Sequence, residues 1–280
     1  GPGMPAKSAS PLFAPASGAG LRLALAVGGA LLAVERRLLY PLFRPARGVI
    51  RRPLLGGGAG RRHRVFRPAG RRPRVPRDGE GHFAAERSYC FNRGPQIYQN
   101  IVREFPSLDA KSVKAKPLLC SRLQSILGFT GIYFPFTGEA NVNVDAPACL
   151  LPATIAHEMS HQRMVASELE ANFVGIAACV SCDDVVFQYS GYLMGLIQLC
   201  NALYPVDDAA WYAIAEEYFN RELSMDWSDN SKYWSALESP LEDAAEDVYD
   251  SFLKSNDQKL GIRSYGACVD LLVNYFGEKL

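Results

Sequence analysis

A glutamate stands between two histidines in the segment AHEMSH, residues 156–161. Positions i and i+4 of an α-helix lie on one face about 6 Å apart along the axis, so His157 and His161 can reach one Zn²⁺. Glu158 follows the first histidine, where a carboxylate can take a proton from a metal-bound water. The pattern predicts a helix over residues 152–164 that carries a zinc site, with Glu158 as its general base.

A catalytic zinc needs a third protein ligand beside an open fourth position. The other histidines, His63 and His82, lie in or beside a basic segment and are poor candidates. Two glutamates lie closer. Ser167 can cap a new helix and Glu170, three residues later, can complete a capping box. That structural role leaves Glu168 as the favoured ligand, with Glu170 as the alternative and a short turn at residues 162–166 before both.

The N-terminal part differs in composition from the rest of the chain. The chain of 280 residues has a net charge of +1, yet residues 1–77 hold Lys7 and fifteen arginines against one acid, Glu35. Residues 1–20 are predicted to be disordered because they are rich in Ala, Gly, Pro and Ser. Residues 41–80 are predicted to be a basic linker, since an Arg/Gly/Pro tract cannot bury a core. No folded nucleic-acid motif accompanies the arginines, so no nucleic-acid partner is expected.

Residues 21–40 are predicted to be a marginal membrane helix or anchor. Residues 21–34 are apolar except for Arg22, and these fourteen residues fall short of the roughly 20 that a bilayer span needs. The basic run that follows suits a cytoplasmic flank. The sequence therefore predicts membrane association through the N-terminal segment.

Residues 81–280 are predicted to form one globular α+β domain, mostly α, with a small sheet. Residues 131–144 alternate and predict a strand or a hairpin that turns at Thr137-Gly138. The odd number of cysteines, seven, argues against a disulfide framework, and Cys179 and Cys182 are interpreted as buried thiols on a helix. Periodicity and end signals predict helices over residues 84–105, 114–127 after a short loop, 152–164, 167–180, 184–204, 209–223, 241–255 and 265–276.

With these motifs in place, residues from about 85 to 278 resemble a bacterial family of uncharacterised membrane-anchored, zincin-like proteins of gluzincin type. The matching stretches are residues 116–122, 131–141, 154–163, 166–173, 189–192, 249–256 and 264–266. The resemblance implies a zincin-like metallopeptidase fold in the bacterial cell membrane, with the side of the membrane left open. It implies Zn²⁺, ligands His157 and His161, and Glu158 as base. Glu168 heads a Glu-x-x-Ala-Asn pattern that many two-His, one-Glu zinc peptidases show.

Two departures from the family pattern stand out. Met164 occupies the turn position where the family usually has glycine, and a methionine adopts positive φ at a cost that glycine does not have. Relatives usually carry a second N-terminal membrane helix, whereas residues 53–77 of this chain are rich in arginine. The first departure predicts a strained or extended turn before the third ligand.

The sequence predicts peptide-bond hydrolysis with a peptide or protein as substrate. Tyr265 and Tyr189 are the candidate donors to the developing oxyanion. The strand at residues 133–143 could hold an extended peptide by β-addition. The alternative is a non-catalytic membrane protein that keeps a zinc site for structure or sensing.

Overall fold

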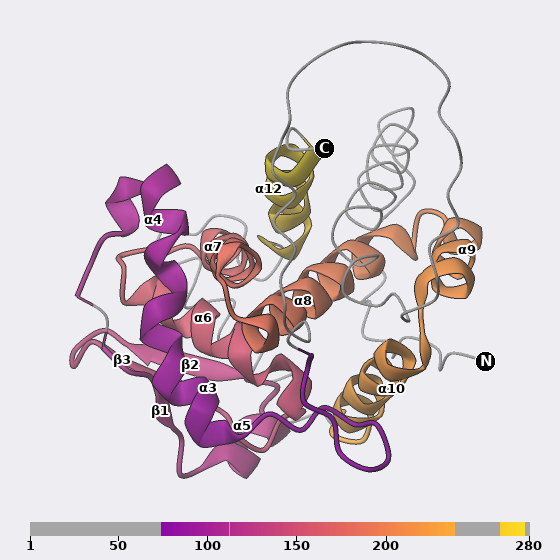
Figure 1. The fold of residues 1–280 in the computed structure, drawn as a ribbon, viewed down its shortest axis with the longest axis horizontal. Coiled ribbons are helices and arrows are strands. Elements are labelled where there is room, and N and C mark those ends of the chain that lie inside the picture. Colours follow the sequence, from indigo (N-terminus) through magenta and orange to yellow (C-terminus); the bar gives the residue numbers. More distant parts are fainter. Residues whose placement is uncertain (1–73, 112, 239–263, 278–280) are drawn as a thin grey trace, which may run out of the picture.

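The computed structural model describes residues 74–111, 113–238 and 264–277. Within them the chain is mostly helical with one three-stranded sheet, so the predicted mostly-α, α+β class is confirmed (Figure 1). The predicted segments at residues 1–20 and 21–40, most of the linker at 41–80 and the predicted helix at 241–255 lie outside the described residues. In the described part, no helix is both long and apolar enough to cross a membrane.

The predicted helix over residues 84–105 is interrupted. Pro95 has no backbone N–H and cannot continue an α-helical ladder, and a 3₁₀ segment begins beside it. Residues after the break form a short helix before a second 3₁₀ turn that contains Pro106. The elements are α3 (Arg87–Arg93), η2 (Gly94–Gln99), α4 (Ile101–Glu104) and η3 (Pro106–Leu108).

The sheet contains the predicted hairpin. β2 (Gly131–Phe134) and β3 (Glu139–Val142) are antiparallel, and Gly138 turns the chain between them with φ 68°. β1 (Lys116–Pro117) pairs in parallel with β3, which gives the order β1-β3-β2 and leaves β2 at an edge. Helix α5 (Ser121–Ile126) connects β1 to β2 and is shorter than the helix predicted there.

Helix α6 (Leu151–His161) occupies the centre of the domain and carries the histidines. Pro152 lies in its first turn, where a missing N–H costs nothing, and all of its residues are buried. The hydroxyl of Ser190 accepts from the backbone N–H of Ala153 at 3.0 Å, which satisfies one of the free donors at the buried helix start. The sheet contacts α6 through β2 and β3.

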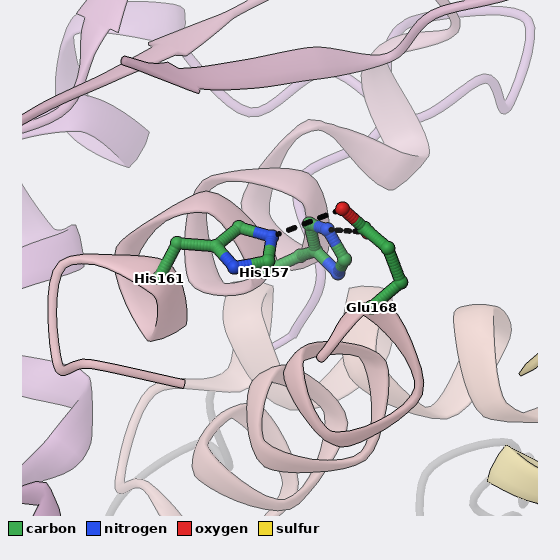
Figure 2. Close-up of side chains that lie close together, drawn as sticks. All are labelled: His157, His161 and Glu168. Atoms are coloured by element: carbon green, nitrogen blue, oxygen red, sulfur yellow. Dashed lines mark ion pairs between the residues drawn. The ribbon is translucent and has the colours of Figure 1, made fainter. Parts of the chain in front are cut away.

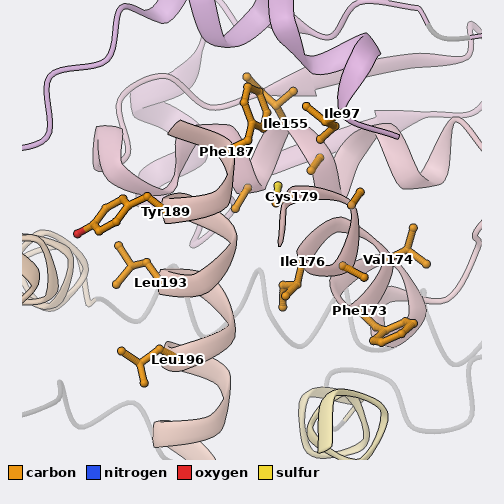
Figure 3. Packing of buried hydrophobic residues seen from close by; sticks show 14 of the residues in the cluster. Ile97, Ile155, Phe173, Val174, Ile176, Cys179, Phe187, Tyr189, Leu193 and Leu196 are labelled. Atoms are coloured by element: carbon orange, nitrogen blue, oxygen red, sulfur yellow. The ribbon is translucent and has the colours of Figure 1, made fainter. Parts of the chain in front are cut away.

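Two further helices complete the core around α6. They are α7 (Glu168–Ser181) and α8 (Val185–Leu203), and α8 begins at Asp184, whose side chain accepts from two backbone N–H groups. Figure 3 shows Ile155 of α6, Ile176 of α7 and Leu193 of α8 within one buried apolar cluster. Cys179 and Cys182 are buried and unbridged, as the sequence predicts, but only Cys179 lies within α7, and Cys182 is the residue that follows this helix.

The C-terminal helices differ in part from the prediction. The helix predicted over residues 209–223 ends early, because Asn220 caps a new helix by accepting from the N–H of Leu223. The structure has α9 (Asp208–Tyr218) and α10 (Arg221–Ser235) there, and α10 was not predicted. The last helix, α12 (Ser264–Gly277), agrees with the helix predicted over residues 265–276 and packs against α7 and α8.

The turn between α6 and α7 contains the strained residue that the sequence predicts. Met164 has φ 65°, and its side chain is 88% exposed. Left-handed backbone costs an L-residue roughly 1–2 kcal/mol, and glycine is free of this cost. The backbone N–H of Met164 donates to His161 at 3.0 Å, so this residue closes the turn directly after the second histidine.

The substitution Met164→Gly is expected to raise the free energy of unfolding by roughly 0.5–1 kcal/mol. This net gain is the backbone strain that glycine relieves, minus the cost of the greater conformational entropy that glycine gives the unfolded chain. Chemical denaturation of the metal-free protein measures this. Met164→Ala is the matched control, because it removes the same exposed side chain and keeps the Cβ atom. An equal gain in both variants would show that the side chain, and not the backbone strain, is responsible.

Candidate metal centre

Three side chains with metal-binding atoms meet between α6 and α7. His157 and His161 lie on the face of α6 that is turned towards the start of α7, and Glu168 is the first residue of α7 (Figure 2). Their potential ligand atoms all lie within 4.8 Å of one another. The structure therefore brings together the two histidines and the favoured glutamate that the sequence singles out.

The separations fit a tetrahedral zinc ion. Glu168 Oε2 lies 3.2 Å from His157 Nε2, and Glu168 Oε1 lies 3.6 Å from His161 Nε2. Ligands at about 2.0–2.1 Å from a tetrahedral centre are about 3.3 Å apart, and both contacts are close to this separation, each through a different oxygen of Glu168. Two imidazole nitrogens and one carboxylate are also a donor set that zinc prefers. The donor types and these two contacts are compatible with a zinc ion.

Close packing of α7 on α6 allows this arrangement. At Gly175, a Cβ atom would lie 2.9 Å from the backbone nitrogen of His157, a separation that side chains do not tolerate. Glycine at this position lets the two helix backbones approach each other. The carboxylate at the start of α7 is thereby held in range of the imidazoles.

Glu168 is ionised at neutral pH in this environment. Burial acts to raise its pKa, but hydrogen bonds from His157 and His161 and their charges outweigh burial and hold the pKa far below its usual range. Burial acts to lower the pKa of His161, yet the contact with Glu168 outweighs burial and raises it. A metal ligand must give up its proton, so protons compete with a cation for these histidines as the pH falls.

The two imidazoles are oriented differently. His161 Nδ1 lies 2.7 Å from the backbone oxygen of Val165, and Tyr133 stacks on the ring with centroids 5.9 Å apart. A donated Nδ1–H of this kind fixes the tautomer and leaves Nε2 for the metal. In contrast, His157 Nδ1 is buried and has no hydrogen-bond partner within the described residues. The turn before α7 therefore holds one ligand firmly by its outer nitrogen.

Glu158 lies beside the cluster and is almost completely buried, at 4% exposure. Its Oε1 is 4.0 Å from His157 Nε2, and it packs on β2, where a Cβ atom at Gly131 would lie 2.4 Å from the same oxygen. Burial raises the pKa of Glu158 to about 7, although the nearby His157 and His161 act to lower it. A carboxyl group tuned close to neutrality suits proton transfer, and a bound cation would lower this pKa again.

The other residues proposed from the sequence lie elsewhere. Ser167 is the N-cap of α7 but its side chain makes no capping bond, and Glu170 is exposed, so the predicted capping box does not form. The hydroxyl of Tyr189 donates to Asp226 in the core. Tyr265 belongs to α12, but its side chain lies outside the described residues.

Three contacts around the site were not predicted from the sequence. They are those of Gly131 with Glu158, Tyr133 with His161 and Gly175 with His157. Alternation along the strand places Gly131 and Tyr133 on one face, and this signal was available. Which face meets the helix, and where α7 approaches α6, depends on packing between segments far apart in the sequence. No local pattern contains that information.

Residues 70–273 match the model of a family described as protein of unknown function, DUF3810. The chain belongs to the DUF3810 family. The matched residues include all three side chains of the candidate metal centre of this DUF3810 protein. Neither a curated protein nor a solved structure matches the chain. The description of the DUF3810 family names no activity.

We expect the purified chain to bind one Zn²⁺. Glu168→Ala is expected to weaken zinc binding by more than roughly 100-fold, which exceeds the loss typical of a residue that contacts a ligand but not the metal. Competition with a chromophoric chelator measures the affinity. Glu170→Ala is the matched control, because it removes the same side chain two residues away from a solvent-exposed position. Equal affinity in the two variants, or a larger loss in Glu170→Ala, would remove Glu168 from the ligand set.

Proposed function

We propose that this chain is a zinc-dependent metallopeptidase of gluzincin type, with a zincin-like domain that hydrolyses peptide bonds. One observation carries the proposal: a buried carboxylate, that of Glu158, lies directly beside a cluster of the donor types that a catalytic zinc uses. The cluster supplies three ligands, which leaves the fourth coordination position for water or substrate.

The residues of the chain divide the reaction between them. His157, His161 and Glu168 would hold the zinc ion, which supplies Lewis acidity that polarises a carbonyl group and acidifies water. Glu158 accepts the proton of the attacking water and then delivers it to the leaving amine. Burial raises the pKa of the Glu158 carboxyl group in the metal-free site, and a bound cation would lower it again, which favours the ionised form that accepts a proton.

The edge of β2 offers a place for the substrate backbone. The N–H of Asn143 donates to the backbone oxygen of Thr130, and the N–H of Gly138 donates to that of Phe134. The backbone groups of every second residue in this segment therefore point towards β3. The N–H and C=O groups of Gly131 and Tyr133 therefore point to the edge of β2 that pairs with no other strand of the described residues. An extended peptide that pairs with these groups would lie along the strand that contacts Glu158 and His161.

A non-catalytic zinc site is the alternative function. Structural zinc sites normally have four protein ligands, whereas the group found within the described residues has three. A structural site would also give no role to the buried carboxyl group of Glu158. Both observations favour hydrolysis.

The wider proposal keeps the remaining expectations from the sequence. Residues 21–40 would attach the domain to the bacterial cell membrane, and the partner of the site is a peptide or protein. Tyr265 stays the proposed donor to the oxyanion. Nucleic acid is not a proposed partner.

Glu158→Gln tests the role of the general base. We expect the zinc-loaded variant to keep its metal affinity and to lose at least about 100-fold in kcat, because the amide cannot accept the proton. Cleavage of a pool of dye–quencher peptides, with zinc content measured in parallel, gives both quantities. Full activity in the variant would contradict the proposed mechanism, and a wild-type chain that holds zinc but cleaves no peptide would contradict the proposed function.

Gly131→Ala tests whether β2 positions Glu158. The added Cβ atom would overlap the carboxylate, so Glu158 must shift away, and a shift of about 1 Å at a reacting group costs on the order of 100-fold in kcat/KM. Zinc affinity is expected to stay unchanged. Gly79→Ala is the matched control because nothing lies within 4 Å of its Cβ position. Equal activity in both variants would show that the strand does not position the base.

A further inference from the structure

We infer that the outward side chains of β2 and its turn, Ile132, Phe134 and Phe136, form a subsite that selects peptides with large apolar side chains two residues apart. These three residues are called the outer row below. The inference rests on the proposed peptidase function for its substrate. It adds the side-chain class that the site prefers.

The outer row is apolar and open to solvent. Ile132 is 48% exposed, Phe134 45% and Phe136 88%, although each is a residue type that is usually buried. The rings of Phe134 and Phe136 contact each other with centroids 5.5 Å apart, so the row continues into the turn. An apolar row of this kind beside a candidate site marks a binding surface.

The charged side chains on the face of the outer row carry no net charge. Lys116 and Glu139 lie on the same face of the sheet as the outer row. Glu139 is opposite Phe134. Lys116 is opposite Asn141, which in turn is opposite Ile132. Their side chains form an ion pair with each other. The two charges offset, so the face carries no strong preference for a charged peptide.

The strand register connects the outer row to the metal centre. Gly131 and Tyr133 point to the inner face, where they contact Glu158 and His161. A peptide paired with the edge of β2 alternates in the same way, so its residues opposite Ile132 and Phe134 point outward. The residue between those two faces the metal centre. The preferred peptide therefore has an apolar residue, then any residue, then a second apolar residue, and the middle residue is the one nearest the metal centre.

Each cross-strand apolar pair is expected to change affinity by roughly two- to five-fold, so two positions together give on the order of ten-fold. The full chain with Glu158→Gln, loaded with zinc, separates binding from cleavage. Its probes are two fluorescein-labelled peptides that differ only in Leu-x-Leu or Ser-x-Ser at the two positions. Fluorescence anisotropy gives the two Kd values and their ratio.

The double substitution Ile132→Thr and Phe134→Thr places β-branched residues, which favour strands, at both positions and removes the apolar contacts. It is expected to reduce the Kd ratio to nearly one. Leu119→Thr is the matched control, because Leu119 is fully exposed after β1 at the other edge of the sheet, and its Kd ratio is expected to stay at the wild-type value. Unfolding midpoints of both variants report whether the sheet is intact.

An unchanged Kd ratio in the folded double variant would overturn the inference, even if the wild-type chain cleaves peptides. Loss of binding to phosphatidylglycerol vesicles with an unchanged Kd ratio would overturn it too, and would assign the outer row to a lipid surface. A ratio that falls as expected supports the subsite. If the wild-type chain then cleaves neither peptide, the subsite stands and the peptidase function fails.

Discussion

The arrangement of the site depends on one partly buried charge, the carboxylate of Glu168, and on the two imidazoles that face it. A carboxylate that is removed from much of the solvent is costly unless it is paired, and this pairing ties the start of α7 to α6. Gly175 permits the close approach of the two helices. The same contacts that satisfy the charge in the absence of metal place three donor atoms around one point, so packing and ligand geometry have a common origin.

The pKa of Glu158 is shifted in the opposite direction to that of Glu168, although Glu158 directly follows the ligand candidate His157. Glu158 lies against β2 and its Oε1 is 4.0 Å from His157 Nε2, beyond hydrogen-bond distance, so burial outweighs the charges of the histidines and its pKa rises to about 7. Glu168 is held ionised by its hydrogen bonds to the histidines. Two carboxyl groups in one site thus differ in proton affinity because of their neighbours, and this difference distinguishes the proposed ligand from the proposed base.

Local patterns predicted the parts of the site that lie within one element. The helix with His157 and His161 and the hairpin that turns at Gly138 follow from spacing and alternation over a few residues. Where periodicity continued across a local signal, the prediction was wrong: Pro95 breaks one predicted helix and Asn220 caps a new one inside another. The stacking of Tyr133 on His161 could not be predicted, because it depends on which face of the sheet packs against α6.

The open edge of β2 also bears on how the protein avoids pairing with copies of itself. An unpaired strand with apolar side chains is a template on which other chains can add and aggregate. β2 is only four residues long, and Pro135 follows it directly and has no N–H to continue a ladder. A short strand closed by proline offers only a brief ladder, which limits how far another chain can pair with it.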